Sequence, residues 1–372
     1  MTGIRPYRVG VIGTSWASRV PLPTFASYEG IELTAICSAR LERAEEAAGR
    51  FGARIAVDDY RALVESEDVD LVYIGAPVRL HHEMALAASA AGKHILCEKP
   101  LALDVTEARE MLEAASEAAV AHVTSFFVRP FESHQYVKQL VASGAIGEPR
   151  QLSVAHFPGW ERGAWSWLDS AGQGGGYLGA VGSHYIDLAR DWLGEFASVS
   201  AQLRTWIGEA DDPGGVSRPV DADDAFLLAG AMEQGAIVSI QFSRNVPPGR
   251  GRRVELYGSD GAVVVDGDEV RGEARVYLAR RGDRAPREVT LPPSRLPSAV
   301  QESAVPIFGA MIHALLLSIE SGRSEGPSFV DGLRCQEVLD AARLSAAEGR
   351  VVPLDPVAGG AGNVTGREGV PR

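Results

Sequence analysis

The sequence predicts two α/β domains, the first built on a parallel sheet and the second on an open, mainly antiparallel sheet. The chain has 372 residues, enough for two domains of ordinary size. Up to about residue 125, apolar strands alternate with helices, which is typical of a parallel sheet with helices on both faces. Later strands are joined by turn pairs such as Gln234-Gly235 and Asp260-Gly261, which indicate antiparallel pairing. We expect domains over residues 1–125 and 126–355.

The composition excludes several kinds of partner. A net charge of −13 argues against nucleic-acid and anionic-membrane surfaces, which need clustered Lys and Arg. Cys37, Cys97 and Cys335 are odd in number and far apart, so neither a disulfide framework nor a zinc spacing is visible. No apolar run reaches the ~18 residues of a membrane span. We expect a cytoplasmic protein with no metal, and a disordered tail over 356–372, which is glycine-rich and aperiodic.

The first strand, residues 8–12, runs straight into Gly13-Thr14-Ser15-Trp16-Ala17. A strand that turns sharply into a helix through small residues lets backbone N–H groups meet a pyrophosphate. Ser15 stands where a second glycine would permit the closest approach, so this is a degraded dinucleotide-binding turn. The alternative is a plain turn.

The second strand, residues 31–37, ends where a Rossmann unit places the group that reads the adenosine ribose. Ser38-Ala39-Arg40 follows, with no carboxylate. A hydroxyl and a guanidinium suit a 2′-phosphate, so we expect NADP rather than NAD. The alternative is that Arg40 is a solvated charge at the start of a helix over residues 41–51.

Two further strands, residues 69–75 and 93–97, lead into Ala76-Pro77 and Glu98-Lys99-Pro100. Helices are expected over residues 82–91 and 105–118, and another strand over 119–125. Ligands of parallel sheets bind at the carboxyl ends of the strands, so these loops should meet the Gly13 and Ser38 turns at one edge. A lysine there lies in a poorly hydrated place where its pKa can fall, and such a lysine can perform acid/base chemistry. His81, which follows the Ala76-Pro77 turn, is a further candidate.

In the second domain, a glycine-rich stretch from Gly174 opens a helix that should run to Leu193. Early glycines cost helix stability, and a close packing or ligand approach would explain them. His184 and Asp187 are three residues apart and can share a face. His184 is either a proton carrier at a substrate hydroxyl or a core histidine hydrogen-bonded by its neighbour. One His and one Asp are too few ligands for a metal.

Trp160, Trp165 and Trp167 precede the glycines on a loop. Their flat apolar faces suit either hinge packing or a wall for a sugar-like ring. The chain closes with expected helices over residues 305–321 and 331–348, the second with Asp331 as a capping residue.

Taken together, these features resemble the Gfo/Idh/MocA oxidoreductase family over about residues 7–355. The motifs that carry the resemblance are Ala91 to Pro100, Gly75-Ala76-Pro77 with His81, and Gly174 to Asp187. The resemblance implies a Rossmann domain, an α/β domain with an open sheet, and NAD(P)-dependent oxidation or reduction of a sugar or cyclitol hydroxyl. Lys99 matches the family lysine and His184 the family histidine, and Pro100 would follow a cis peptide bond.

The resemblance and the strand ends together give the expected site. Lys99 and His184 are the catalytic candidates, with the substrate hydroxyl between them and Glu98 orienting Lys99. The substrate should also contact Trp165, Trp167 and Asp187. The cofactor should contact Gly13, Thr14, Ser15, Trp16, Ser38, Arg40, Ala76, Pro77, His81, Glu98 and Lys99. The exposed sheet face of the second domain should form a homodimer or homotetramer.

One departure from the family pattern affects the mechanism. Many members have an aspartate four residues before the histidine, and this chain has Ala180 there. Either Lys99 and His184 handle the proton alone, or the chain is a non-catalytic sensor of a sugar or nucleotide. A third reading is a lyase or glycosidase that oxidises a sugar carbon transiently. Ser15 and Val78 also depart from the common Gly and Asn. We favour the active oxidoreductase because Lys99, His184 and the cofactor turn are retained.

Overall fold

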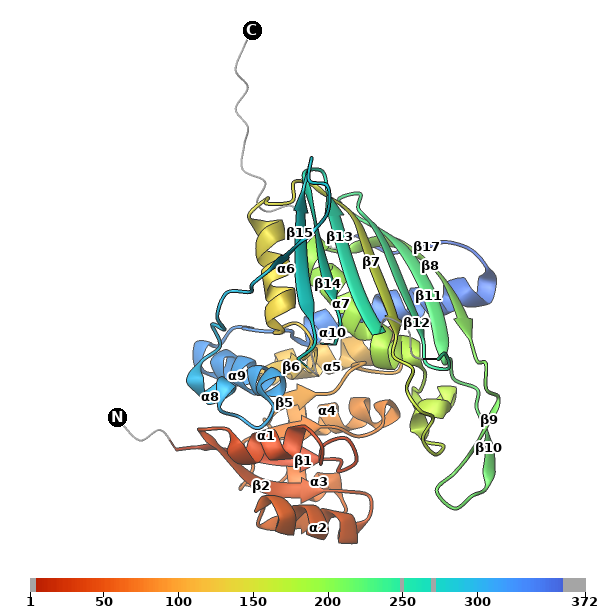
Figure 1. Cartoon of the computed structure of the whole chain (residues 1–372). Helices are drawn as coiled ribbons and strands as arrows, with labels where there is room; N and C mark the ends of the chain where they lie inside the picture. Colours follow the sequence, from red (N-terminus) through yellow and green to blue (C-terminus); the bar gives the residue numbers. More distant parts are fainter. Residues whose placement is uncertain (1–4, 248–250, 269–271, 357–372) are drawn as a thin grey trace.

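The computed structural model describes residues 5–247, 251–268 and 272–356. Two large sheets dominate the molecule, one in each half of the chain, with helices packed between and around them (Figure 1). The predicted disordered tail lies, from residue 357 onward, outside the described residues. Among the described helices, none is long and apolar enough to cross a membrane.

The N-terminal sheet has six parallel strands in the order β3-β2-β1-β4-β5-β6. This is the Rossmann order, in which the direction of strand addition reverses between β1 and β4 and leaves a crevice for a dinucleotide. The predicted parallel sheet is confirmed, although β3 was not predicted. The strands are β1 (Tyr7–Ile12), β2 (Ile31–Cys37), β3 (Ile55–Val57), β4 (Leu71–Ile74), β5 (His94–Cys97) and β6 (His122–Thr124).

Helices cover both faces of this sheet (Figure 1): α1 (Pro21–Ser27), α2 (Leu41–Phe51), α3 (Tyr60–Val64), α4 (His81–Ala90) and α5 (Val105–Glu117). The helix α5 begins where the Asp104 carboxylate accepts from the backbone N–H groups of Thr106 and Glu107 at 2.8 and 3.0 Å. The expected immediate turn from strand to helix after Gly13 is wrong. Residues 14–20 form successive turns, and α1 begins only at Pro21, whose fixed φ suits the first helical position.

The second sheet has nine strands in the order β16-β15-β14-β13-β7-β12-β11-β8-β17. All neighbours pair antiparallel except β7 and β12, which are parallel, so the sheet is mixed but mainly antiparallel as predicted. A separate hairpin of β9 and β10 projects beside the domain (Figure 1). The strands are β7 (Pro149–Phe157), β8 (Phe196–Arg204), β9 (Glu209–Asp211), β10 (Ser217–Pro219), β11 (Ala225–Met232), β12 (Ile237–Ser243), β13 (Gly251–Gly258), β14 (Gly261–Asp266), β15 (Arg275–Arg280), β16 (Arg287–Val289) and β17 (Val352–Pro353).

The helices of the second half are α6 (Glu132–Ala142), α7 (Ser183–Leu193), α8 (Ser298–Gln301), α9 (Pro306–Ser321) and α10 (Phe329–Glu348). Short helical turns precede α4 and α7, namely η1 (Val78–Leu80), η2 (Trp167–Asp169), η3 (Ala171–Gln173) and the π-helical η4 (Leu178–Gly182). The prediction that Asp331 starts the last helix is wrong by two residues. Ser328 caps α10, and Asp331 is the third helical residue, whose carboxylate accepts from the Ser328 N–H at 2.8 Å.

The helix α9 packs against the N-terminal sheet although it follows the second sheet in sequence. Its Phe308 ring meets Phe25 and Tyr73 edge-on, with centroids 5.7 Å apart in both pairs, and Met311 belongs to the same core. The helix α10 bridges the halves, because Phe329 and Leu333 join the core of α4 and α5 while Val338 and Leu339 join the core beneath the second sheet. The two halves are thus tied together by the C-terminal helices.

Candidate active site

The ends of β1, β2, β4 and β5 meet at one edge of the N-terminal sheet, as predicted. Gly13 ends β1 with a φ of +96°, which favours glycine, and a Cβ there would lie 2.5 Å from the Gly75 carbonyl oxygen. The loops after β1 and β4 therefore touch backbone to backbone at the switch point. Packing of these two loops therefore requires glycine at position 13, and they meet at the switch point where dinucleotides bind to sheets of this strand order.

The next cofactor candidates are in contact with one another. The Thr14 hydroxyl donates to the Ser38 hydroxyl oxygen at 3.2 Å, and the Ser38 N–H donates to the Val57 carbonyl at 3.1 Å. Arg40 is exposed at the start of α2. The contacts of Thr14 and Ser38 join the ends of β1, β2 and β3. The exposed Arg40 side chain lies beside them, where a ligand can reach its guanidinium.

Trp16 leads from the cofactor turn toward the second half of the chain. Its ring is 39% exposed and stacks on Phe127 with centroids 6.3 Å apart, while Ser15 beside it is also exposed. Phe127 in turn packs edge-on against His184 at 4.7 Å. Phe127 was not predicted, since a Phe after a strand carries no sequence signal for a site.

The buried His81 ring contacts the loop after β4 and the loop after β5. One ring nitrogen lies 2.8 Å from the Ala76 carbonyl oxygen, and the other lies 3.2 Å from the carbonyl oxygens of Pro100 and Leu101. The residue is 1% exposed, and burial lowers the pKa of its imidazole. We therefore propose a positioning role for His81, in place of the expected direct contact with the cofactor.

The Glu98-Lys99-Pro100 stretch follows β5 in a buried setting. A Glu98 carboxylate oxygen accepts from the Tyr73 hydroxyl at 3.0 Å, and the other accepts from the Lys99 backbone N–H at 3.3 Å. Burial raises the pKa of Glu98, while the Lys99 charge opposes the shift. Glu98 thus contacts the Lys99 main chain, which is the link through which it would orient the lysine. The Lys99–Pro100 peptide bond is cis, as the resemblance implied.

The Lys99 ammonium reaches across to the second half of the chain. Its Nζ donates to the Ala180 carbonyl oxygen at 2.5 Å. Burial lowers the pKa of Lys99, and the Glu98 carboxylate partly opposes this. Residue 180, where the resemblance led us to expect an aspartate, thus contacts the lysine through its backbone carbonyl. The contact comes from η4, and a Cβ at Gly179 would lie 3.3 Å from the Pro100 ring, so these two segments pack closely.

His184 lies in the first turn of α7 and keeps an unused nitrogen. Its Nδ1 is buried and has no hydrogen-bond partner among the described residues. Burial lowers the pKa of His184 well below its usual range, and the charge of Lys99 adds to this. A buried polar atom without a partner is unusual in a folded protein, and it is a position where a ligand can bind. The alternative of a core histidine hydrogen-bonded by Asp187 is not what the structure shows.

Asp187 is instead engaged by an arginine that was not predicted. Both carboxylate oxygens accept from Arg129, at 2.6 and 2.5 Å, and the Asp187 side chain is not exposed. Burial raises the pKa of Asp187 to about 6, which still leaves it ionised at neutral pH opposite the guanidinium. Arg129 also contacts Asp331 at the start of α10. Asp187 therefore fixes α7 in place, and we do not propose it as a substrate ligand.

The tryptophans of the loop after β7 have different surroundings. Trp165 belongs to the hairpin, because its indole N–H donates to the Pro219 carbonyl at 2.9 Å and the Arg218 guanidinium lies over its ring. Trp167 is half-buried at the start of η2. Trp160, 41% exposed, packs against Tyr177 with ring centroids 6.3 Å apart. The placement favours hinge packing for Trp165, and Trp160 lies closer to the η4 segment that contacts Lys99.

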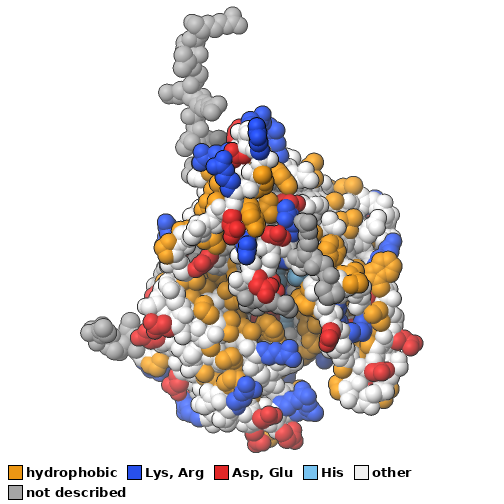
Figure 2. All heavy atoms as spheres, in the orientation of Figure 1, with side chains coloured by type: hydrophobic (Ala, Val, Ile, Leu, Met, Phe, Trp, Pro, Cys, Tyr) orange, Lys and Arg blue, Asp and Glu red, His pale blue; other side chains and the backbone are white. Residues whose placement is uncertain are grey.

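Figure 2 shows a hollow on the front face, between the N-terminal half and the second sheet, with histidine atoms visible inside it.

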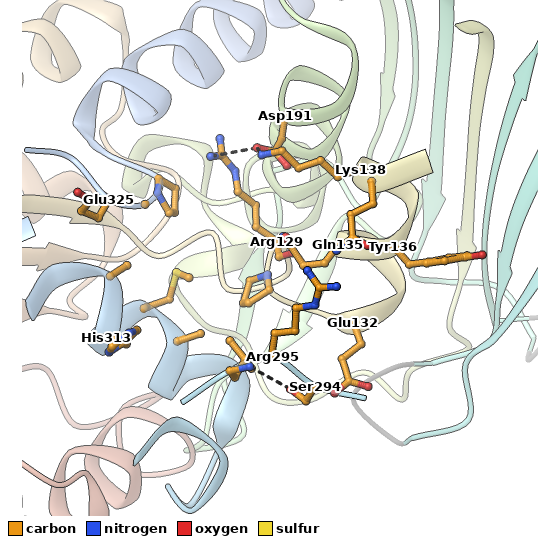
Figure 3. Close-up of a pocket in the computed structure, with 18 of the residues that line it drawn as sticks. Arg129, Glu132, Gln135, Tyr136, Lys138, Asp191, Ser294, Arg295, His313 and Glu325 are labelled. Carbon is orange, nitrogen blue, oxygen red and sulfur yellow. Dashed lines mark hydrogen bonds and ion pairs between the residues drawn. The ribbon is translucent and has the colours of Figure 1, made fainter. Parts of the chain in front are cut away.

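A separate cavity of about 380 Å³ is lined by Arg129 and lies where α6, α9 and the loop before α8 meet (Figure 3). Its lining includes Lys138 and Asp191, which form an ion pair at 2.7 Å. None of the predicted site residues lines this cavity. Its connection to the candidate site runs through Arg129 and Asp187.

Comparison with known proteins decides the family. Residues 7–127 match the family model described as an oxidoreductase family with an NAD-binding Rossmann fold, and residues 134–264 match the GFO/IDH/MocA C-terminal domain. The levoglucosan dehydrogenase of Pseudarthrobacter phenanthrenivorans is 33% identical over 346 residues, covering 84% of this chain and 87% of that protein. The chain belongs to the Gfo/Idh/MocA family. It is an NAD(P)-dependent oxidoreductase of that family.

Other members of the Gfo/Idh/MocA family give the same picture. The myo-inositol 2-dehydrogenase of Thermotoga maritima is 28% identical, over 95% of this chain and all of that protein. A solved structure of levoglucosan dehydrogenase in complex with NADH and levoglucosan superimposes with a TM-score of 0.82 at 30% identity, covering 94% of this chain and 99% of that one. The predicted family and fold are thereby confirmed.

Proposed function

We propose that this enzyme transfers a hydride between the nicotinamide cofactor and a hydroxyl-bearing carbon of a sugar or cyclitol. Relatives whose names specify levoglucosan and myo-inositol as substrates support this substrate class. The observation that carries the proposal is the juxtaposition at the strand edge. Burial lowers the pKa of Lys99, whose ammonium donates to the Ala180 carbonyl in η4. The next helix begins with Ser183 and His184, and the buried His184 Nδ1 has no hydrogen-bond partner among the described residues.

In this proposal the nicotinamide ring accepts or supplies the hydride. Lys99 takes the hydroxyl proton in the oxidative direction and returns it in the reductive one. His184 stays neutral because of its burial, so it can hold the substrate oxygen by a hydrogen bond without a competing charge. The Ala180 carbonyl positions the Lys99 Nζ, which makes a carboxylate at residue 180 unnecessary for holding the lysine.

A spectrophotometric screen tests this function. The purified protein is mixed with neutral hexoses, anhydrosugars, inositols and sugar acids, each with NAD or NADP, and absorbance of the reduced cofactor is followed. We expect turnover with at least one member of these sets. A protein that binds the cofactor but reduces none of it with any of these compounds would support the sensor alternative instead.

We further propose NADP as the preferred cofactor, because Ser38 and Arg40 offer a hydroxyl and a guanidinium where an NAD site usually has a carboxylate. Solved structures of levoglucosan dehydrogenase contain NADH, so the preference for NADP is a specific property proposed for this chain.

Replacing Ser38 with Asp should reverse this preference, because the new carboxylate would repel a 2′-phosphate. We expect the ratio of kcat/KM for NADP to kcat/KM for NAD to fall by about tenfold or more. The matched control is Arg19→Ala, in the turns before α1. A wild-type enzyme with equal or greater kcat/KM for NAD would contradict the proposal.

The second sheet supports the proposed homodimer or homotetramer. Leu227 on β11, Ile237 on β12 and Tyr257 on β13 are 42%, 59% and 41% exposed. The strand register places all three on one face of the sheet. Ile237 and Tyr257 both pair with Gln151, so these two side chains point to the same side. Ala231 pairs with Ile237, and Leu227, four residues earlier on the same strand, points to the same side as Ala231. Exposed apolar side chains grouped on one sheet face are typical of an interface between subunits.

A further inference from the structure

Two arginines from different segments lie near Tyr177, the residue just before η4. Arg244 follows β12, and its guanidinium carbon lies 5.4 Å from the Tyr177 ring centroid. Arg162 lies on the loop after β7, with its side chain 19% exposed. The Arg244 Nη2 donates to the carbonyl oxygen of Glu161, the residue before Arg162, so the two arginines lie near each other.

These arginines have more donors than the protein has acceptors for them. Arg162 gives one Nη2 hydrogen bond to Asp169 at 2.9 Å, but its Nε and Nη1 are buried and have no hydrogen-bond partner among the described residues. Arg244 gives one Nη2 hydrogen bond to the Glu161 carbonyl at 3.3 Å, and its buried Nε has no partner within the part of the chain that the structure describes. Buried donors left without acceptors are costly, which indicates that something else accepts from them.

The neighbouring carboxylates are already occupied. Asp224 accepts from the backbone N–H groups of Trp206 and Ile207 at 3.0 and 3.2 Å, and from the Asn245 amide at 2.5 Å. Asp169 accepts from the Ser166 N–H as well as from Arg162. Within the described part of the chain, Arg244 has no carboxylate oxygen within 4.0 Å. It is therefore a partly buried cation without an anionic partner.

Tyr177 links this pair of arginines to the candidate site. It directly precedes η4, whose Ala180 carbonyl holds Lys99, and its ring stacks on Phe242 with centroids 5.1 Å apart. His156 packs on the same Phe242 ring and lies 2.9 Å from the hydroxyl of Tyr185, the neighbour of His184. Arg244 thus contacts the residue that directly precedes the segment holding Lys99, and Arg162 lies beside Arg244 in the loop after β7.

We propose that Arg162 and Arg244 together bind an acidic oxygen group of the substrate, so that the preferred sugar or cyclitol carries a carboxylate or a phosphate. Guanidinium groups present several N–H donors in a fixed plane, which suits the oxygens of either group. Arg244, which has no carboxylate partner among the described residues, also supplies local positive charge in a chain whose net charge is −13. This inference rests on the proposed function for the identity of the ligand as a sugar, but its test does not require turnover.

The test measures binding by calorimetry, with the protein saturated with reduced cofactor so that no oxidation occurs. Matched pairs are glucose with glucuronate, galactose with galacturonate, and glucose with glucose 6-phosphate. We expect at least one acid to bind about tenfold or more tightly than its neutral counterpart, since a charge-assisted hydrogen bond contributes at least that much. Comparison of the uronates with the phosphate identifies the group. Equal affinities within every pair, or no measurable binding of any acid, would overturn the proposal.

Variants locate the anion site. Arg244→Gln and Arg162→Gln should each weaken the acid by about tenfold or more and leave the neutral sugar unchanged, while Arg244→Lys should restore part of the acid affinity. Arg204→Gln is the matched control, because Arg204 is exposed on β8 and, among the described residues, its guanidinium hydrogen-bonds only the Leu203 carbonyl. Equal weakening of acid and neutral sugar would contradict an anion site. If acids bind but no cofactor reduction is ever found, the proposed function fails while the anion site stands.

Discussion

Replacing Lys99 with Met is expected to lower kcat by about 100-fold or more while cofactor affinity stays within about threefold of the wild type. A positioned acid/base group contributes this much to the rate, and Met keeps the length of the side chain but cannot carry a proton. The Lys99 Nζ contact with the Ala180 carbonyl would also be lost. Steady-state kinetics and titration of cofactor fluorescence measure the two quantities separately. A variant that keeps more than about a tenth of the wild-type rate would rule out Lys99 as the proton carrier.

Lys93→Met is the control for this variant, because Lys93 precedes the other end of β5. Its Nζ donates to the carbonyls of Ser66 and Val69 at 2.9 and 2.8 Å, so the change affects packing rather than the candidate site.

The pH dependence of the rate gives a second test of Lys99. Because burial lowers the pKa of Lys99, oxidation should become faster as pH rises through a pKa below 10.5, the ordinary lysine value. This rise should be absent in the Lys99→Met enzyme.

Replacing Arg129 with Met is expected to lower the free energy of unfolding by about 3–5 kcal/mol, the usual result of removing one partner of a buried ion pair. Asp187 would be left with no exposed surface and without its bidentate partner, and Asp331 would lose a contact as well. The loss would also loosen α7, which carries His184. Urea unfolding followed by circular dichroism measures the change.

The matched control is Arg323→Met, since Arg323 pairs with Glu325 at 3.5 Å and is 80% exposed. An exposed ion pair of this kind contributes about 0–1 kcal/mol. A midpoint for Arg129→Met as close to the wild type as that of the control would show that Arg129 does not stabilise α7.

The parts of the site that follow from local sequence were predictable. Gly13, Ser38 and Lys99 each end a strand of a parallel sheet, and the topology rule that joins such strand ends at one edge requires no knowledge of side-chain packing. The pattern of strands in the second half likewise predicted a mainly antiparallel sheet. Here the hydrophobic periodicity and the turn residues agreed with the tertiary structure.

The remaining features depend on contacts between distant segments. Arg129 pairs with Asp187 across 58 residues and with Asp331 across 202, and no local pattern encodes either partner. Trp165 resembled a sugar platform in sequence but is held by the Pro219 carbonyl on a hairpin that was not predicted. His81 followed a strand-end turn as expected, and its burial between two loops is the basis for the positioning role that we propose for it. In each case the tertiary neighbours, rather than the residue type, set the role.

The transfer of the hydride itself is the most direct test of the proposed mechanism. A substrate found in the screen is prepared with deuterium on the carbinol carbon and incubated with the enzyme and oxidised cofactor, and the released cofactor is analysed by mass spectrometry. The proposed function predicts free reduced cofactor that carries the deuterium, formed about 100-fold or more slowly by the Lys99→Met enzyme. Deuterium that returns to the sugar product with no net cofactor reduction, or that never leaves the substrate, would contradict it.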